Sequence, residues 1–197
     1  MTAQIQPQTG ADIWTKCGPW RFTRESIIIG TAAEALLQLY RRAFEPLKVR
    51  AAARHVLTRE EFLGQMEDHR IDKYVVWEDS GEPVAIITLT RHLDAVPWIS
   101  PEYFAARYPE QWARNAVYYL GFAFTRSTTQ RSRFLEIAVE MAIEPLTMER
   151  AVIAYDVCSY NNSVLGLSKR IAEVLRRNSH SLPEKLDSQI YYGVNFA

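Results

Sequence analysis

Two apolar segments joined by one helical segment constrain the fold of this chain most. Residues 116–124 are almost continuously apolar, and so are residues 151–157, which is typical of strands buried on both faces. Between them the sequence predicts a single helix over residues 130–143, ended by Pro145. A strand–helix–strand unit of this length predicts two parallel strands with a right-handed crossover.

The preceding part of the chain predicts antiparallel strands. Residues 74–79 and 84–90 are rich in β-branched and aromatic residues, and they flank a turn segment that contains Gly81. This pattern indicates a β-hairpin. Further strands are expected over residues 20–29 and 189–196. Parallel and antiparallel strands then belong to one mixed sheet.

Helices are expected on both sides of these strands. A capping box, in which the first and fourth side chains satisfy each other's backbone N–H groups, predicts two helix starts. These are Thr31 with Glu34 and Thr58 with Glu61. Ser100 followed by Pro101 predicts a short helix, and Asn161 begins another that runs to about residue 178. The sequence therefore predicts the α/β class, as a single-domain mixed sheet with helices on both faces.

Composition excludes several function classes. Lys+Arg and Asp+Glu both number 23, so no net charge attracts the chain to nucleic acid or to an anionic membrane. No apolar run approaches the ~18 residues of a spanning helix. The two cysteines and four scattered histidines have no metal-ligand spacing, so no metal site is expected. We expect a cytoplasmic protein, with a flexible segment over residues 1–19 and one domain over residues 20–197.

The predicted order of elements resembles the Gcn5-related N-acetyltransferase (GNAT) superfamily. Two local features carry the resemblance: the strand over residues 116–124 runs into a turn rich in hydroxyls and Arg, and Val157-Cys158-Ser159-Tyr160-Asn161 is similar to the family's strand-end asparagine. The resemblance implies an acyl-CoA N-acyltransferase-like fold and an acyl-CoA donor such as acetyl-CoA. It also implies that Asn161 contacts the donor's pantetheine arm or fixes the loop, although an asparagine there is also a common helix cap.

The pyrophosphate loop of that family corresponds to residues 130–135. The family's two small loop residues are replaced by Arg133 and Leu135, so its glycines are missing. A helix N-terminus still offers free amides and a positive dipole end to a phosphate. The alternative is a solvated first helical turn. The residues expected to bind the donor are Phe124, Arg126, Thr128, Thr129, Gln130, Arg131, Ser132, Arg133 and Asn161.

The resemblance implies direct attack of an acceptor amine or hydroxyl on the thioester carbonyl. A base or water takes the acceptor's proton, and a backbone amide of the strand over residues 116–124 polarises the carbonyl. Many family members carry a tyrosine at the position of Ser168. The catalytic candidates are Ser168, Cys158 and Asp156; the alternatives for the first two are an ordinary helix serine and an inert buried thiol.

Aromatic side chains gather just before and within the strand over residues 116–124. They could cover an acceptor or acyl chain, or form a satellite core. These residues are Trp98, Tyr103, Phe104, Tyr108, Trp112, Tyr118 and Tyr119. Two hypotheses for function remain. One is an acyltransferase that uses acyl-CoA or an acyl carrier protein, and the other is a non-catalytic binding or self-association module. A homodimer stays open, and no nucleic-acid or membrane partner is expected.

Overall fold

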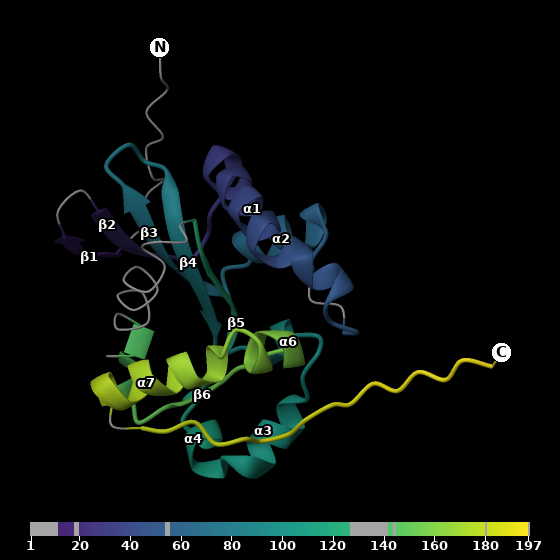
Figure 1. Ribbon diagram of the computed structural model, residues 1–197. Coiled ribbons are helices and arrows are strands. Elements are labelled where there is room, and N and C mark those ends of the chain that lie inside the picture. The colour runs from purple at the N-terminus through teal and green to yellow at the C-terminus, as the bar shows by residue number, and fades with distance from the viewer. Residues whose placement is uncertain are drawn as a thin grey trace.

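A six-stranded sheet, with its strands in chain order from β1 to β6, forms the centre of the protein (Figure 1). The computed structural model describes residues 12–17, 20–53, 56–126, 142–143, 145–179 and 181–196. The strands are β1 (Asp12–Cys17), β2 (Trp20–Glu25), β3 (Asp72–Glu78), β4 (Pro83–Thr90), β5 (Val117–Thr125) and β6 (Val152–Ala154). Neighbours from β1 to β5 are antiparallel, and β5 and β6 are parallel.

This sheet confirms the two main predictions about strand pairing. β3 and β4 form the antiparallel hairpin, with Tyr74 opposite Ile87. β5 and β6 run parallel, with Val117 opposite Val152, as a strand–helix–strand connection requires. Most of the helix expected over residues 130–143 lies outside the described residues; residues 142–143 are helical.

Helices α1 (Gly30–Phe44) and α2 (Arg59–Glu67) cover one face of the sheet. Tyr40, 1% exposed, lies at the centre of this layer, and its hydroxyl accepts a hydrogen bond from the Leu57 N–H at 2.9 Å. Four aromatic rings surround it with centroids 4.6–5.8 Å away: Phe44, Phe62, Phe122 and Phe124. Burial of these rings fixes α1 against β5.

The opposite face of the sheet packs against a helical segment at residues 145–148. Its buried side chains include Phe22, Tyr74, Val76, Ile87, Tyr118, Ala142 and Leu146. The mixed sheet therefore has helices on both faces, as the sequence predicts.

The insertion between β4 and β5 covers one end of the sheet with η2 (Leu93–Ala95), α3 (Pro101–Arg107) and α4 (Pro109–Ala113). The predicted helix start is confirmed, because the Ser100 hydroxyl accepts a hydrogen bond from the Tyr103 N–H at 3.3 Å. The aromatic residues divide between two environments. Phe104 and Tyr119 are buried in a satellite core, whereas Trp98, Tyr103 and Trp112 are exposed.

One of the two predicted capping boxes is wrong. At α2 the Thr58 hydroxyl accepts from the Glu61 N–H at 3.2 Å, and the Glu61 carboxylate accepts from the Thr58 N–H at 2.7 Å. At α1 the helix already begins at Gly30, after Ile29, so Thr31 lies inside the first turn and caps nothing. The carboxylate of Glu34 instead pairs with Arg59 of α2.

Two predicted strands are shorter than expected. The strand predicted over residues 20–29 ends at Glu25, because the chain leaves the sheet and the Ile28 N–H donates to the Met66 carbonyl of the helical layer at 2.9 Å. The strand predicted over residues 151–157 is only Val152–Ala154. β1, in contrast, was not predicted, and it lies within the segment that the sequence suggested to be flexible.

The C-terminal part of the chain also differs from prediction. The helix expected from Asn161 onward is two helices, α6 (Ser159–Ser163) and α7 (Leu167–Ser179). Gly166 interrupts them with φ = +64°, and Asn161 lies within α6 rather than at its cap. The strand predicted over residues 189–196 is wrong, since the described residues from 181 to 196 belong to no strand. The remaining helical segment is η1 (Glu45–Val49), which follows α1.

Candidate functional site

The candidate site lies where β5 and β6 cease to run side by side. The two strands pair only at Val117–Val152, Tyr118–Ile153 and Tyr119–Ala154, after which β6 ends while β5 continues to Thr125. The carboxyl ends of neighbouring parallel strands are the usual place for a ligand in an open α/β sheet.

Among the described residues, no strand pairs with β5 on the side that β6 leaves, which we call its open side. The Arg126 N–H donates to the Val84 carbonyl at 2.7 Å, toward β4. Alternate residues of a strand direct their backbone groups to opposite edges. The backbone N–H and C=O of Ala123 and Thr125 therefore point away from β4, toward the side where β6 is absent.

A bulge interrupts the pairing of β4 with β5 in the same region. The register shifts between Ile87 and Leu89, where Gly121 and Phe122 together oppose Thr88. The Thr88 hydroxyl accepts a hydrogen bond from the Phe122 N–H at 3.0 Å. A Cβ on Gly121 would lie 2.9 Å from that hydroxyl oxygen, so only glycine fits without displacement.

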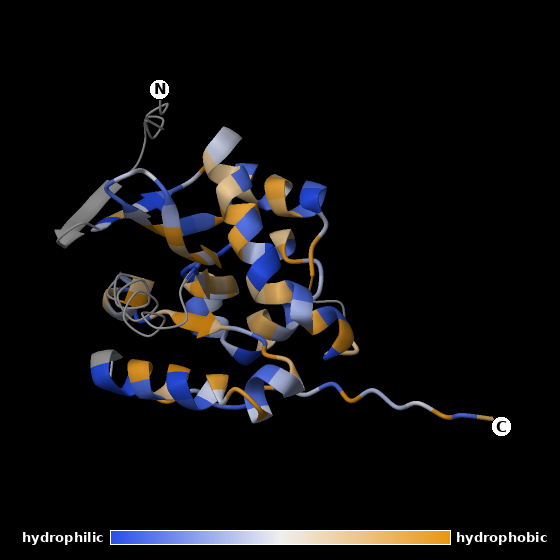
Figure 2. Cartoon of the chain, turned by 45° about the horizontal axis from the view of Figure 1, so that its top comes forward, coloured by the Kyte–Doolittle hydropathy of each residue, from blue (hydrophilic) through white to orange (hydrophobic). Residues whose placement is uncertain are grey.

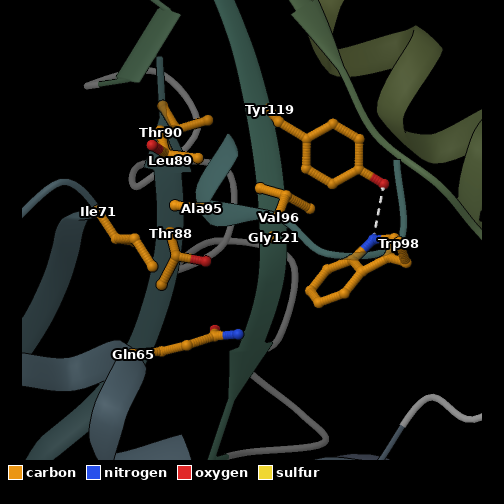
Figure 3. Close-up of a pocket in the computed structure, with 10 residues that line it drawn as sticks. All are labelled: Gln65, Ile71, Thr88, Leu89, Thr90, Ala95, Val96, Trp98, Tyr119 and Gly121. Atoms are coloured by element: carbon orange, nitrogen blue, oxygen red, sulfur yellow. Dashed lines mark hydrogen bonds between the residues drawn. The ribbon is translucent and has the colours of Figure 1, made fainter. Parts of the chain in front are cut away.

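A small pocket opens beside this bulge (Figure 3). α2 contributes Gln65, and the segment from η2 onward contributes Trp98, whose indole is half exposed. The residues that line the pocket are Gln65, Ile71, Thr88, Leu89, Thr90, Ala95, Val96, Trp98, Tyr119 and Gly121. The pocket thus combines an apolar wall with the hydroxyl, amide and indole groups that can orient a polar ligand.

Tyr119 links this pocket to Asp156 at the end of β6. The Trp98 indole N–H donates to the Tyr119 hydroxyl at 3.2 Å, as Figure 3 shows. Because an indole N–H only donates, the Tyr119 hydroxyl directs its own proton to the Asp156 carboxylate, with which it forms a hydrogen bond. Tyr119 is 2% exposed, whereas Asp156 is exposed to solvent.

Burial is the main cause of a raised pKa for the Tyr119 hydroxyl, and the neighbouring Asp156 charge and hydrogen bond add to it. Tyr119 therefore stays a neutral donor at ordinary pH. That donor orients the carboxylate of Asp156, an exposed residue, which makes Asp156 the candidate base of this site.

Apart from Asn161, the predicted donor-binding residues fall into three groups. Phe124 packs its side chain into the aromatic layer under α1, and its backbone faces Ile86 of β4, so neither points to the open side of β5. The Arg126 guanidinium is paired with Glu78 of β3. Six further residues lie outside the described residues: Thr128, Thr129, Gln130, Arg131, Ser132 and Arg133.

The remaining predicted residues lie after β6. Asp156 and Cys158 precede α6, Asn161 lies within it, and Ser168 is in the first turn of α7; the last three are half-buried. Cys158 is a free thiol. α6 is held against η1, because Arg50 donates to the Tyr160 hydroxyl at 2.8 Å and lies 4.8 Å from the ring centroid.

Sequence reasoning missed Thr88 and Gly121 as site residues, and it did not connect Tyr119 with Asp156. A glycine inside an apolar strand is a known signal of a bulge, so Gly121 could have been found. Within the part of the chain that the structure describes, no group of His, Cys, Asp and Glu could hold a metal ion. None of the described helices combines the length and apolarity needed to span a membrane.

No protein-family model matches the sequence, and no curated protein matches it. The structure is similar to that of an aminoglycoside acetyltransferase from an uncultured soil metagenomic sample in complex with trehalose. The similarity has 12% sequence identity and a TM-score of 0.50, and it covers 90% of this chain and 97% of that chain. A structure of the same enzyme with sisomicin is similar at 10% identity and a TM-score of 0.49, with the same coverage. The first of these similarities establishes an acyltransferase-like α/β fold for this chain.

Proposed function

We propose that this protein is an acyltransferase that moves an acyl group from acyl-CoA or an acyl carrier protein to an amine or hydroxyl. The observation that carries this proposal is the separation of parallel β5 and β6 directly beside the bulge and its pocket. An acyltransferase-like fold supports the same reaction class. One fold hosts several functions, so the reaction is assigned from the groups at this site.

The thioester of the donor fits along the open side of β5. Ala123 directs its backbone N–H to this side, so that amide can donate to the thioester carbonyl oxygen. The negative charge that develops on this oxygen during attack strengthens such a bond, which is how an amide lowers the barrier. Arg126 is already paired with Glu78, so we assign the phosphate groups of acyl-CoA to Arg131 and Arg133 instead.

We place the acceptor at the mouth of the pocket of Figure 3, beside Tyr119, with its nucleophile near the Asp156 carboxylate. The Asp156 carboxylate holds an ammonium group and takes its proton. The neutral amine attacks the thioester carbonyl carbon; a C–N bond forms and the C–S bond breaks. The nitrogen then carries one surplus proton, which passes to the departing thiolate through solvent, and Asp156 returns its own proton to solvent. A hydroxyl acceptor reacts in the same way with a C–O bond.

The test measures thiol release from acetyl-CoA, and from an acetylated acyl carrier protein, with a panel of primary amines and alcohols. The key variant is Asp156→Asn, which keeps an oxygen to accept from Tyr119 but removes the base. We expect kcat to fall about 100-fold, because general-base catalysis contributes about 10²–10⁴-fold. Glu173→Gln, an exposed carboxylate of α7, is the control and should leave kcat unchanged.

A second candidate function is a non-catalytic module on the same fold. The ion pair of Arg126 with Glu78 favours this module, because it makes a guanidinium next to the donor loop less available to the donor's phosphate groups. Calorimetric titration with acetyl-CoA separates the candidates. Binding without thiol release for any acceptor would favour the module, and release that is equal in the wild type and the Asp156→Asn variant would refute the assigned base.

A further inference from the structure

The outer edge of β6 is the first of two complementary features. β6 is the last strand of the sheet, and the Val152 N–H donates to the Ala116 carbonyl of the neighbouring strand at 2.9 Å. Since successive residues direct their backbone groups to opposite edges, the N–H and C=O of Ile153 point outward. No strand among the described residues pairs with this edge. An open edge of this kind is a template for another strand.

The second feature is the segment of residues 189–196, which we call the tail. Its sequence alternates in the period of a strand, and the apolar residues of one face are highly exposed. The exposed fractions are 68% for Ile190, 89% for Tyr192, 74% for Val194 and 92% for Phe196. The tail leaves the body of the protein as an extended segment, with apolar residues recurring along it (Figures 1 and 2).

The tail also lacks the features that protect exposed strands from pairing. It contains no charged residue and no proline, and neither does β6. Natural proteins commonly place lysine or proline on strands that stay unpaired. Eight extended residues span about 26 Å, enough to cover all of β6 and continue beyond it.

The chain before the tail is anchored, and this anchor sets the direction of the tail. Glu184 accepts hydrogen bonds from Arg107 at 3.1 and 3.2 Å and from the Tyr108 hydroxyl at 2.9 Å. Tyr103 donates to the Leu186 carbonyl at 3.3 Å. The Leu186 side chain packs on the satellite core, of which Ala154 of β6 is a member. The tail thus starts near β6 but is directed away from its own sheet (Figure 1).

We infer that the tail pairs as a strand with the outer edge of β6 in a second copy of this chain. Each copy carries both the tail and the open edge of β6. Two copies related by a two-fold axis beside their anchors can therefore exchange tails, which gives a closed dimer. The pairing supplies partners for the outward backbone groups of β6 and covers the apolar face of the tail. This dimer does not depend on acyl transfer, although it covers the strand that leads to Asp156.

The test compares the wild type with a tail variant that carries Tyr192→Lys and Val194→Lys. Both side chains are largely exposed in one copy, so the substitutions leave the fold of a monomer unaffected. Light scattering during size exclusion should give twice the mass of one chain for the wild type and the mass of one chain for the variant. Val49→Lys, at an 88% exposed residue of η1, is the control and should stay dimeric.

Hydrogen exchange of the tail amides identifies the interface itself. We expect at least tenfold slower exchange over residues 189–196 at concentrations where the protein is a dimer than after dilution to monomer. A monomer at all concentrations overturns the inference, even if its tail is protected, since the tail would then pair within its own chain. A dimer that persists in the tail variant, or whose tail exchanges freely, overturns it as well.

Discussion

Replacement of Gly121 by alanine tests the geometry of the bulge. The new Cβ would lie 2.9 Å from the Thr88 hydroxyl oxygen, closer than real side chains approach. Thr88 is 1% exposed and bonded to the Phe122 N–H at 3.0 Å, so it cannot move without cost. If it stays, the contact is overpacked by about 1–3 kcal/mol. If it rotates away, the Phe122 N–H loses its partner, at a similar cost of about 1–3 kcal/mol.

Alanine also restricts the unfolded chain, which offsets about 0.4–1 kcal/mol of this loss. We therefore expect the Gly121→Ala variant to lose about 1–2 kcal/mol of unfolding free energy, measured by urea denaturation. The matched control is Gly64→Ala in the middle of α2, where an added Cβ would meet no atom within 4 Å. There alanine should stabilise the protein by about 1 kcal/mol through helix propensity.

A double-mutant cycle with Thr88→Ala isolates the contact. Thr88→Ala alone removes the hydroxyl that Phe122 needs, but it also creates room for the new Cβ. In the Gly121→Ala/Thr88→Ala variant the loss should therefore be smaller than the sum of the single losses by about 1 kcal/mol or more. Strict additivity, or a Gly121→Ala variant as stable as the Gly64→Ala variant, would refute the proposed packing of the bulge.

Three further predictions concern stability. Burial lowers the pKa of Lys73 to about 8, so above that pH the unfolded chain binds more protons than the folded chain. The unfolding free energy should therefore rise between about pH 8 and pH 9.5, relative to that of a Lys73→Met variant. Equal pH slopes of the unfolding free energy for both proteins would contradict this prediction. Thr58→Ala should lower the unfolding free energy by about 1 kcal/mol, because it removes the cap of α2. In the same denaturation assay, Thr31→Ala should lower it by less than about 0.5 kcal/mol. Equal losses would mean that Thr31 caps α1 after all. Phe122→Ala, at a 6% exposed position in the aromatic layer, should cost about 3–5 kcal/mol, and a loss below 1 kcal/mol would contradict the core described here.

The strand pairing was predictable because it depends on patterns that extend over many residues. Two apolar strands with one helical connection permit only a parallel pair, and a turn between β-rich segments permits only a hairpin. Both predictions are confirmed. Helix starts depend instead on one or two residues, and so the same capping pattern is correct at Thr58 and wrong at Thr31. There the entry of the chain from Ile29 decides where the helix begins.

The strand predicted over residues 189–196 is wrong, although the alternation that suggested it is present in the sequence. Alternation shows that a segment can form a strand, but it does not indicate which edge receives it. In a single chain the anchor at Glu184 and Leu186 directs this segment away from the sheet. In the dimer that we infer, this segment forms a strand with β6 of the other copy.

The candidate site was predictable in part. Asp156 was among the sequence candidates because it lies at the end of a predicted strand, and the structure adds its partner Tyr119. That partnership joins residues 37 positions apart and depends on the parallel register of β5 and β6, which sequence alone does not provide. Arg126 was selected for its charge, and no local pattern reveals that Glu78 lies beside it across the sheet.

Hydrogen exchange of β5 in the presence of acetyl-CoA tests the central claim most directly. The proposal requires the donor to cover the open side of β5, where Ala123 directs its N–H. We predict that saturating acetyl-CoA slows amide exchange over residues 120–125 at least tenfold, while β2 (Trp20–Glu25), at the other side of the sheet, is unchanged. Unchanged exchange over residues 120–125 at full saturation, or protection confined to elements away from β5, would contradict a donor site between β5 and β6.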